Sequence, residues 1–297
     1  MTNKRFTGIM PALVTPVTHD GLLRADVVKQ LVDWQLRQGV DGFYICGHTG
    51  EGPALSEETR RRMAEMVREC VSTQDVICHV GAADANSSLR LARHAGEIGC
   101  DAIASLPPTG YYGYSEDEIY DYYTRLGEAS PLPLLAYANA MFKQADIVPF
   151  VERLMEIPTA IGLKFTRMNC YELRNIAELN GGDINVINGP DEMLVNGLMA
   201  GADGGIGSTY NIMPGRFVKL FEAFEAGDIK GAFQMQFEIN RIIRVIIKYG
   251  VIRTVKQTLC EMGFDAGGPA FPGHGFTRDE AQLLRKEMGE AGFSYEI

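Results

Sequence analysis

The feature that most constrains the fold is an alternation of short apolar runs with amphipathic stretches, repeated eight times between residues 8 and 226. The apolar runs have the length of buried strands, and the amphipathic stretches have the length of helices. The predicted strands are Gly8–Val14, Gly42–Cys46, Val76–Val80, Ala102–Leu106, Leu132–Tyr137, Ile161–Phe165, Ile184–Ile187 and Gly204–Ile206. The predicted helices cover residues 25–38, 56–71, 87–98, 115–128, 145–155, 169–179, 191–200 and 214–226.

Eight successive β-then-α units are the number that a (β/α)₈ barrel needs. A doubly wound parallel sheet also alternates strands and helices, and it is the alternative. The barrel is favoured because the units are even in length and because no dinucleotide-binding fingerprint follows the first strand. The sequence therefore predicts an α/β fold in which residues 1–227 form a (β/α)₈ TIM barrel.

The alternation stops after residue 227, and three further helices are predicted over residues 228–248, 251–262 and 278–291. A Gly/Pro-rich stretch, residues 267–273, separates the last two. No linker precedes this part of the chain. We therefore expect residues 228–297 to be a C-terminal helical extension packed on the barrel as a single structural unit.

A short pattern recurs where a helix gives way to the next strand, at residues 39–42, 99–102 and 201–204. Each copy begins with glycine and has aspartate in its third position. A glycine can end a helix in the left-handed conformation, and the aspartate can satisfy the turn. We expect the pattern to serve folding at the bottom of the barrel and to carry no chemistry. Ser56 is predicted to cap the second helix.

Composition and charge exclude several classes of protein. The net charge is −10, from 28 basic and 38 acidic side chains, which disfavours binding to a phosphate backbone. The densest basic cluster, Arg60–Arg62, is expected on the solvated face of a helix. No apolar run approaches the roughly 20 residues of a membrane span, and no signal peptide is apparent. We expect a cytoplasmic protein with neither nucleic-acid nor membrane partners.

Cysteine and histidine spacing argues against local metal sites and against a disulfide framework. No cysteine pair has CxxC spacing, which is typical of buried free thiols in a reducing compartment. No HxH or HxxxH pair occurs among the five histidines. We therefore predict that the protein holds no metal.

Catalytic groups in a barrel lie at the carboxyl ends of the strands, which directs attention to the sixth strand. Period-two alternation places Ile161, Leu163 and Phe165 on one face and Lys164 on the other. A lysine that points into the barrel is costly unless it is paired or deprotonated. Desolvation can produce a nucleophilic amine that forms a Schiff base with a carbonyl. The alternatives are a snorkelling lysine and a structural ion pair.

The ends of other strands carry further candidates. Tyr137 ends the fifth strand and is either a proton-relaying phenol or an aromatic at the rim. The run Gly47–Gly52 is either a turn whose N–H groups hold an anion or a plain tight turn. Asp191 follows the seventh strand and could simply cap the next helix. Residues 205–211 after the eighth strand bring short polar groups to the same rim.

Together these residues resemble the N-acetylneuraminate lyase and dihydrodipicolinate synthase superfamily of class I aldolases. The resemblance extends from about residue 8 to residue 262, and more weakly to the end of the chain. It is carried by Gly47–Glu51 (GHTGE), Tyr137, Gly162–Thr166 (GLKFT) and Gly201–Met213 (GADGGIGSTYNIM). The last motif and Asn188–Glu192 (NGPDE) are most similar to the N-acetylneuraminate lyase branch.

The resemblance implies a barrel with a C-terminal helical extension, usually a homotetramer, that uses no cofactor. It implies that Lys164 forms the Schiff base with pyruvate and that Tyr137 relays protons. The backbone of residues 48–49 and the hydroxyl of Thr49 would hold the pyruvate carboxylate, and Tyr111 of a neighbouring subunit would complete the relay. Groups that match the polyol-binding residues of the lyase branch are Thr166, Gly189, Asp191, Glu192 and Ser208.

Two departures from the family pattern concern the distal end of the substrate. His48 stands where the family usually has serine or threonine, and it can still donate to a carboxylate. Residues 138–142 lack the Asn-x-Pro pattern that often follows the tyrosine. The synthase branch places an arginine there for a second carboxylate, and none occurs between Tyr137 and Arg153. This absence argues against aspartate semialdehyde as the acceptor.

The leading hypothesis is a lyase that reversibly cleaves N-acetylneuraminate, a small 2-keto acid, to pyruvate and N-acetylmannosamine. The alternative within the superfamily is a pyruvate-dependent aldolase for another 2-keto-3-deoxy sugar acid, or a dihydrodipicolinate synthase-like enzyme. A non-catalytic sugar-acid sensor and a metal-dependent aldolase are hypotheses of other classes. Trapping of a Schiff base discriminates against the sensor, and loss of activity in a chelator would favour the metal enzyme.

Overall fold

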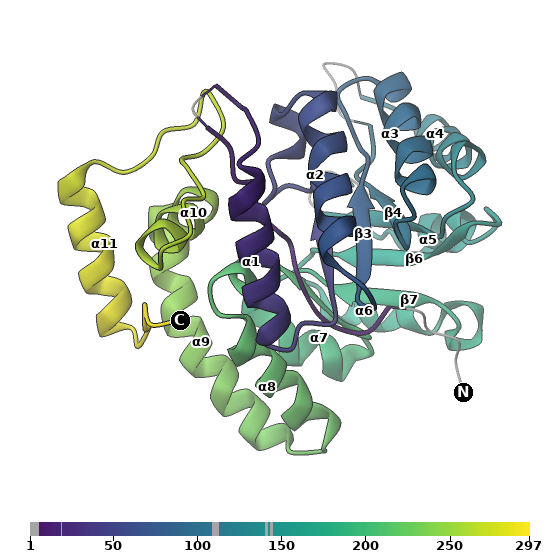
Figure 1. The fold of residues 1–297 in the computed structure, drawn as a ribbon. Coiled ribbons are helices and arrows are strands. Elements are labelled where there is room, and N and C mark those ends of the chain that lie inside the picture. The colour runs from purple at the N-terminus through teal and green to yellow at the C-terminus, as the bar shows by residue number, and fades with distance from the viewer. Residues whose placement is uncertain (1–5, 19, 109–112, 140–141, 143–144) are drawn as a thin grey trace.

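The predicted (β/α)₈ barrel is confirmed by a computed structural model, which describes residues 6–18, 20–108, 113–139, 142 and 145–297 (Figure 1). Eight parallel strands follow one another around the sheet in the order β1-β8-β7-β6-β5-β4-β3-β2. Every hydrogen-bonded neighbour is also a neighbour in the chain, apart from the contact of β1 with β8 that brings the ends together. The strands are β1 (Gly8–Pro11), β2 (Gly42–Ile45), β3 (Asp75–His79), β4 (Ala102–Ser105), β5 (Leu134–Ala138), β6 (Ala160–Phe165), β7 (Asn185–Asn188) and β8 (Gly204–Gly207).

The seam between β1 and β2 is joined more sparsely than the other strand pairs, and Pro11 is the reason. The N–H groups of Gly8 and Ala12 point to the β8 side, where they bond the carbonyls of Asp203 and Gly207. The N–H positions of residues 9, 11 and 13 alternate with these and point to β2, where the N–H of Leu13 bonds the carbonyl of Tyr44 at 2.9 Å. Pro11 falls in this second set and has no N–H to donate. The ladder of the seam is therefore interrupted, and its described part has an isolated parallel bridge between Ala12 and Tyr44 in place of a continuous pairing.

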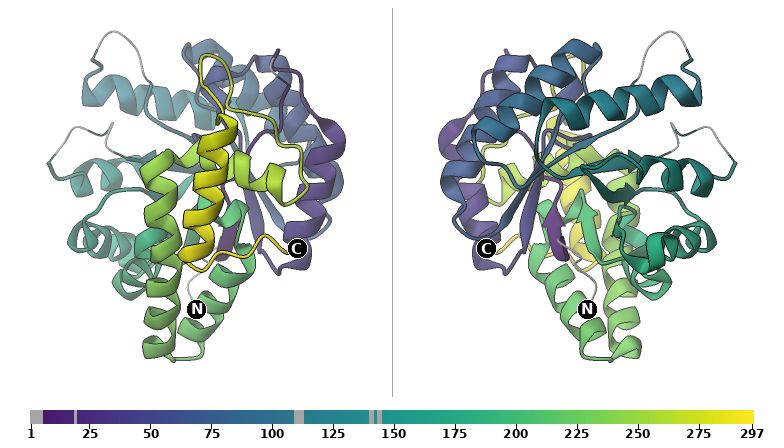
Figure 2. Two further views of the ribbon diagram at one scale, coloured as in Figure 1. Left: turned by 90° about the vertical axis from the view of Figure 1, so that its left-hand side faces the viewer. Right: turned by 90° about the vertical axis from the view of Figure 1, so that its right-hand side faces the viewer.

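Helices cover the outside of the barrel, and each follows the strand that precedes it in the chain (Figures 1 and 2). Ser56 caps α2 as predicted, because its side chain accepts a hydrogen bond from the N–H of Thr59. The helices of the barrel are α1 (Ala25–Arg37), α2 (Glu57–Cys70), α3 (Ala85–Glu97), α4 (Glu116–Ala129), α5 (Val148–Leu154), α6 (Cys170–Ala177), α7 (Leu194–Ala200) and α8 (Pro214–Glu225).

The recurring glycine–aspartate turns have a more extended role than a local turn. Gly39, Gly99 and Gly201 are left-handed as predicted, with φ of 87°, 75° and 108°. The aspartates do not bond their own turns alone. The carboxylates of Asp41, Asp101 and Asp203 accept hydrogen bonds from the N–H groups of Ile9, Val76 and Val186, each on a neighbouring strand, at 2.7, 2.9 and 2.8 Å. The pattern therefore aligns adjacent strands at the bottom of the barrel.

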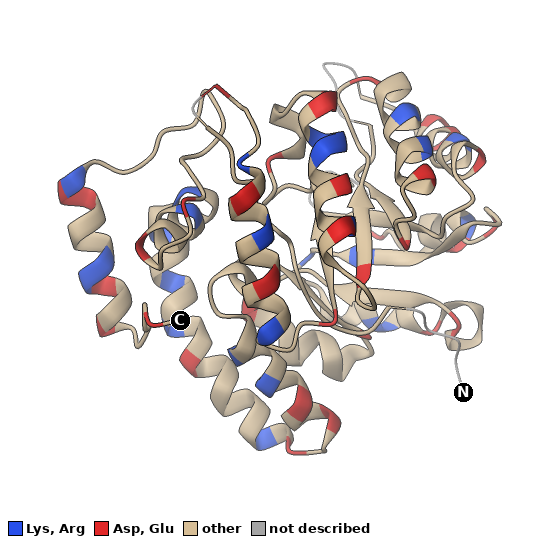
Figure 3. Ribbon diagram, in the orientation of Figure 1, with Lys and Arg blue, Asp and Glu red and all other residues tan. Residues whose placement is uncertain are grey.

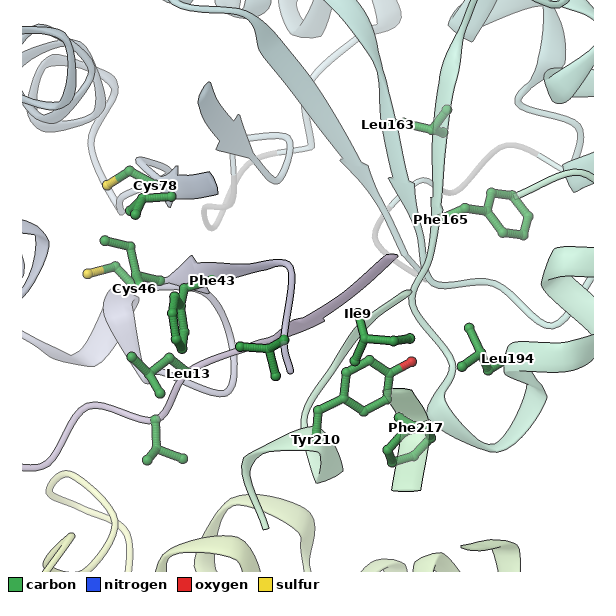
Figure 4. Close-up of a cluster of buried hydrophobic side chains, with 14 of the residues drawn as sticks. Ile9, Leu13, Phe43, Cys46, Cys78, Leu163, Phe165, Leu194, Tyr210 and Phe217 are labelled. Carbon is green, nitrogen blue, oxygen red and sulfur yellow. The ribbon is translucent and has the colours of Figure 1, made fainter. Parts of the chain in front are cut away.

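Two apolar layers result from the alternation along the strands. The larger lies between strands and helices, and Figure 4 shows Phe43, Leu163, Phe165 and Tyr210 in it. A smaller cluster fills the barrel itself, and it consists of Phe6, Met10, Ala12, Tyr44, Ile77, Ala102, Ala104, Leu135, Ile187 and Ile206. This inner cluster fills the barrel with apolar side chains, and polar groups gather where the strands end, at the carboxyl rim.

The C-terminal extension consists of α9 (Ile229–Tyr249), α10 (Val251–Glu261) and α11 (Arg278–Glu290), which lie together beside α1 and α8 (Figures 1 and 2). Phe264 packs its ring against Trp34 of α1 at 5.3 Å between centroids. Gln236 of α9 reaches the barrel, where its side chain accepts from the N–H of Val195 and donates to the carbonyl of Asp191. The extension thus contacts residues of the barrel rim as well as its outer helices.

Acidic and basic residues are interspersed along the helices (Figure 3). One expectation about them is wrong: Arg60 is only 3% exposed and does not belong to a solvated face. Its guanidinium donates to the carbonyls of His79 and Gly81, so it holds the end of β3. The six cysteines are free thiols. In the described part of the chain, no helix has the length and apolar character needed to cross a bilayer.

Candidate active site

Lys164 lies inside the barrel near the carboxyl end of β6, as the alternation of the strand predicts. Its neighbours Leu163 and Phe165 point outward into the helix-facing core. The side chain of Lys164 is buried, and the residue is 5% exposed. Among the described residues no carboxylate forms an ion pair with its Nζ. Two aromatic rings contact it instead, since Nζ lies 4.5 Å from the ring centroid of Tyr44 and 4.6 Å from that of Tyr137.

Three aromatic side chains form one wall of this site. The rings of Tyr44, His79 and Tyr137 are mutual neighbours, with centroids between 6.1 and 6.2 Å apart. Burial, with the positive charges of Arg60 and Lys164 nearby, lowers the pKa of His79 to about 3. His79 is therefore neutral, and because its Nε2 accepts from the N–H of Leu106, its proton sits on Nδ1. The rings provide a polarisable surface for a cation without adding a charge.

Sequence reasoning missed Tyr44 and His79. The signal that could have found Tyr44 was the same alternation that placed Lys164, applied to β2, because Phe43 and Ile45 face the helices. In β3 the same argument turns Cys78 outward and His79 inward. Neither strand contains a charged residue in its interior to draw attention to the face that points into the barrel.

The run Gly47–Gly52 forms a turn at the end of β2, on the opposite side of the mouth from β6. The side chains of Thr49 and Ser208 share a hydrogen bond of 2.6 Å, which joins this turn to the end of β8. Thr15 donates to the carbonyl of Gly50 at 2.6 Å. The His48 side chain is exposed at the mouth. Partial desolvation of its ring lowers the pKa of His48, and the charge of Lys164 lowers it further.

Asp191 does not cap its helix, which corrects one of the two predictions made for it. Helix α7 begins three residues later, after the short helix η3 (Asp191–Met193), and its N-terminus has no side-chain cap. The Oδ2 atom of Asp191 instead accepts from the N–H and the hydroxyl of Thr209, at 2.7 and 2.6 Å. Burial raises the pKa of Asp191 to about 6, although both bonds from Thr209 oppose the shift. A buried carboxyl that titrates near neutrality can accept or donate to a hydroxyl.

Thr166 and Gly189 meet at the end of β6 and β7. The hydroxyl of Thr166 is buried and has no hydrogen-bond partner among the described residues. A Cβ atom at Gly189 would lie 1.8 Å from that hydroxyl oxygen, so only glycine fits here. Glu192 is half-buried beside Asp191, and its backbone carbonyl accepts from Asn240 of α9 at 3.0 Å. Two neighbouring strands thus bring an unpaired hydroxyl and a carboxylate to one rim.

The structure therefore brings nine of the ten predicted site residues to the carboxyl end of the barrel. They are His48, Thr49, Tyr137, Lys164, Thr166, Gly189, Asp191, Glu192 and Ser208. The tenth, Tyr111, lies outside the described residues, as do residues 140–141 of the loop after β5. Within the described ranges, no group of three or more His, Cys, Asp or Glu side chains is arranged to hold a metal ion.

The barrel carries a rim of polar groups around a buried lysine, which is the architecture of a (β/α)₈-barrel enzyme, and relatives of this chain are lyases. The chain belongs to the dihydrodipicolinate synthetase family, whose model matches residues 5–289.

Individual relatives and solved structures show which members of the family the chain is similar to. An N-acetylneuraminate lyase of Rhizobium meliloti strain 1021 is 36% identical over 267 residues, which are 90% of this chain and 88% of the relative. The structure of N-acetylneuraminate lyase (sialic acid aldolase) from Aliivibrio salmonicida superimposes with a TM-score of 0.91, at 27% identity and 98% coverage of each chain. A catalytic lysine mutant of the Ruminococcus gnavus sialic acid aldolase gives a TM-score of 0.90 at 27% identity, covering 96% of this chain and 95% of that one.

Proposed function

We propose that this protein is a class I aldolase that reversibly cleaves N-acetylneuraminate to pyruvate and N-acetylmannosamine. The observation that carries the proposal is the buried amine of Lys164, which contacts two aromatic rings and no carboxylate among the described residues. The relatives add support, because those named above are N-acetylneuraminate lyases or sialic acid aldolases and one of them was solved with its catalytic lysine replaced.

Lys164 is the nucleophile in this proposal. Its neutral amine adds to the C2 carbonyl of the open-chain sugar acid, and loss of water with uptake of one proton gives a cationic imine. The imine accepts the electron pair of the C3–C4 bond as the C4 hydroxyl loses its proton. N-acetylmannosamine leaves, and an enamine stays on Lys164. A proton added at C3 and a water molecule added at C2 then release pyruvate and the free amine.

Tyr137 moves the proton of the C4 hydroxyl in this proposal. Its ring contacts Nζ of Lys164, so its phenol lies on the same side of the barrel as the reacting carbons. A positioned phenol can accept that proton and return it in the reverse direction, directly or through the substrate carboxylate. Tyr111 from a neighbouring subunit would complete the relay.

The carboxylate of the substrate is assigned to the Gly47–Gly52 turn. The backbone N–H groups of His48 and Thr49 and the Thr49 hydroxyl would donate to it. The bond between Thr49 and Ser208 supports this assignment, because it fixes the hydroxyl at the mouth of the barrel. A neutral His48 can add a further donor from its ring.

The polyol chain is assigned to the opposite half of the rim. The unpaired hydroxyl of Thr166 gains a partner when a substrate hydroxyl binds, which removes the cost of a buried group without a hydrogen bond. Both bonds from Thr209 go to Oδ2 of Asp191, and Oδ1 is the oxygen for a substrate hydroxyl. Gly189, Glu192 and Ser208 line the rest of this half.

One observation favours a second candidate function, a pyruvate-dependent aldolase for a different 2-keto-3-deoxy sugar acid. The imidazole of His48 is larger than the hydroxyl side chains that the family usually has there, and it lies exposed at the mouth. It would change the fit of the substrate without altering the chemistry at Lys164. A dihydrodipicolinate synthase-like reaction is less well supported, because no arginine follows Tyr137 before Arg153.

We also infer that the enzyme is a cytoplasmic homotetramer that uses neither metal nor organic cofactor. Free buried thiols support a reducing compartment, and a covalent imine on Lys164 supplies the electron sink that a cofactor would otherwise provide. Light scattering on the purified protein tests the tetramer. Full activity after dialysis against a chelator is the expected result, and loss of activity that metal restores would overturn the inference.

Borohydride reduction during turnover tests the proposed function. The enzyme is incubated with N-acetylneuraminate, with pyruvate alone in a parallel sample, and digested for peptide mass spectrometry. A reduced pyruvyl group on Lys164 from the sugar acid is the expected result, and Lys164→Ala is the control that must lack it. An adduct in the pyruvate sample, with none in the N-acetylneuraminate sample, would support the second candidate. No adduct in either sample would exclude the Schiff-base mechanism.

A further inference from the structure

A buried ion pair joins the C-terminal extension to the turn at the end of β2. Lys256 of α10 is 0% exposed and Glu51 is 8% exposed. Their Nζ and Oε2 atoms are 2.5 Å apart. The two residues are distant in the sequence, and no contact of either side chain with the substrate is proposed above. Glu51 is, however, only two residues after Thr49, within the Gly47–Gly52 turn.

Both ions also bind the same short segment that follows α10. Lys256 donates to the carbonyl of Gly268 at 2.9 Å, and Glu51 Oε1 accepts from the N–H of Ala270 at 2.7 Å. The pair and residues 268–270 are thus connected by one ion pair and two hydrogen bonds. Each buried charge has two partners, the opposite ion and a backbone group of this segment, which offsets part of the cost of burying it.

The turn contains one residue in an unfavourable backbone conformation. Glu51 has φ of 54°, a left-handed conformation that is unfavourable for a residue with a side chain. The next residue, Gly52, has no room for a Cβ, which would lie 1.9 Å from the carbonyl oxygen of Cys46. A left-handed glutamate persists only where its surroundings hold it, and the bonds from Lys256 and Ala270 are the contacts that hold this side chain.

Stability alone is a poor explanation for such a pair. An apolar pair of the same volume usually stabilises a core as well as a buried ion pair or better, because desolvation offsets the attraction. Burial lowers the pKa of Lys256, and the charge of Glu51 opposes that shift. By contrast, the extension is joined to itself by more exposed pairs, such as Lys248 with Glu287. A buried, directional pair also fixes the position of the backbone that carries each residue, here the turn that carries Glu51.

We propose that Glu51 and Lys256 are positioning residues through which the C-terminal extension sets the backbone of the Gly47–Gly52 turn. In this role the extension determines how tightly the turn holds the carboxylate of a 2-keto acid. The inference rests on the proposed function for the identity of the anion. The geometry of the turn can be tested without it.

The experiment compares Lys256→Met, Glu51→Gln, Lys256→Arg and the double variant of Glu51→Gln with Lys256→Met. Lys248→Met is the matched control, because it breaks an ion pair of the extension that does not touch the barrel. For each protein, the pyruvate concentration that gives half of the maximal borohydride adduct on Lys164 is measured, together with the maximal yield. Hydrogen exchange of the peptide that covers residues 47–52 is measured on the same proteins without pyruvate.

We expect both single charge-removing variants to need about tenfold or more pyruvate, because a displaced binding group loses much of its effect. The maximal yield should stay near that of the wild type, since Lys164 is unchanged. The double variant should raise the pyruvate requirement by less than the product of the two single increases. Lys256→Arg, which keeps the charge, should raise it less than Lys256→Met. Lys248→Met should match the wild type. The exchange of residues 47–52 should rise in the same variants that lose affinity.

Wild-type pyruvate requirements together with unchanged exchange at residues 47–52 would overturn the proposal, even if the variants melt at a lower temperature. Where Lys256→Met does not fold, Glu51→Gln and Lys256→Arg decide, since both nearly preserve volume or charge. The absence of any adduct in the wild type would instead contradict the proposed function. In that case unchanged exchange across the variants would still overturn the positioning role, and faster exchange confined to the turn would support it.

Discussion

Tyr137 and Lys164 are paired residues in the parallel register of β5 and β6, so their side chains leave neighbouring strands on the same face. The register alone brings the ring of Tyr137 to 4.6 Å from the Lys164 Nζ atom. No loop is needed to hold this pair. Groups fixed on strands are more precisely placed than groups on loops, which suits a nucleophile and its proton carrier.

Replacing Tyr137 by phenylalanine separates the ring from the phenol. The ring contact with Lys164 stays in Tyr137→Phe, so the pyruvate adduct should still form. The loss of the proton carrier should reduce kcat for cleavage by about 10²- to 10⁴-fold. Steady-state cleavage of N-acetylneuraminate and borohydride trapping, measured on the same sample, check both halves. An unchanged kcat would exclude Tyr137 as the relay.

Tyr44 should respond oppositely to loss of its hydroxyl and loss of its ring. The hydroxyl is buried without a hydrogen-bond partner among the described residues, so Tyr44→Phe should leave the free energy of unfolding unchanged or raise it by about 1 kcal/mol. Tyr44→Leu removes the ring from above Lys164 and leaves a cavity, and it should destabilise the protein by about 3 kcal/mol. Urea denaturation measures both values. A larger loss of unfolding free energy in Tyr44→Phe than in Tyr44→Leu would contradict the conclusion that the ring, and not the hydroxyl, stabilises the protein.

Asp191 should make the stability of the protein depend on pH in a definite direction. Its native pKa is raised to about 6 from 3.8, so the native state binds this proton more tightly than the unfolded state. The free energy of unfolding should therefore fall as the pH rises from 3.8 to 6, by about 3 kcal/mol, when wild type is compared with Asp191→Asn. Denaturation of both proteins between pH 3.5 and 7.5 tests this. A difference that does not change with pH would contradict it.

Gly189→Ala should damage the polyol half of the site more than the pyruvate half. The new methyl group would meet the hydroxyl of Thr166 at 1.8 Å, which forces that side chain to move, at a cost of about 1–3 kcal/mol. KM for N-acetylneuraminate should rise, and trapping of pyruvate on Lys164 should be unaffected. Gly289→Ala is the control, because a Cβ there meets nothing within 4 Å. Equal loss for both substrates would place Gly189 outside the polyol subsite.

The fold was predictable because every strand and helix of the barrel has its own local signal, and the errors at their ends have local causes. The helix predicted over residues 145–155 begins instead at Val148, because Pro149 fits only in a first turn. Helix α3 begins at Ala85, two residues earlier than predicted. The cap is Asp84, whose side chain accepts from the N–H of Ser87. The first strand ends at Pro11, before its apolar run does.

From pattern alone, the site was predictable only where the alternation of residues within a single strand shows which side chains point into the barrel. Lys164 and Tyr137 follow from the faces of β6 and β5, and the family motifs added the rim residues. The partners of Asp191 did not follow, because Thr209 comes from a different strand end and meets it only in the closed barrel. The pairing of Glu51 with Lys256 had no local signal either. Arg60 was misassigned because charge in sequence does not show which carbonyls lie within reach.

Pro11 gives this closed sheet a preferred place to open. A barrel has no free edges, and a missing N–H inside it means that thermal fluctuations can separate two strands there with fewer bonds to break. The carbonyl of Tyr44, next to the reactive lysine, accepts one of the few bonds across that line. The line of fewest hydrogen bonds in the barrel therefore runs beside its most reactive group, where a small shift of the Tyr44 ring would alter the electrostatic surroundings of the amine.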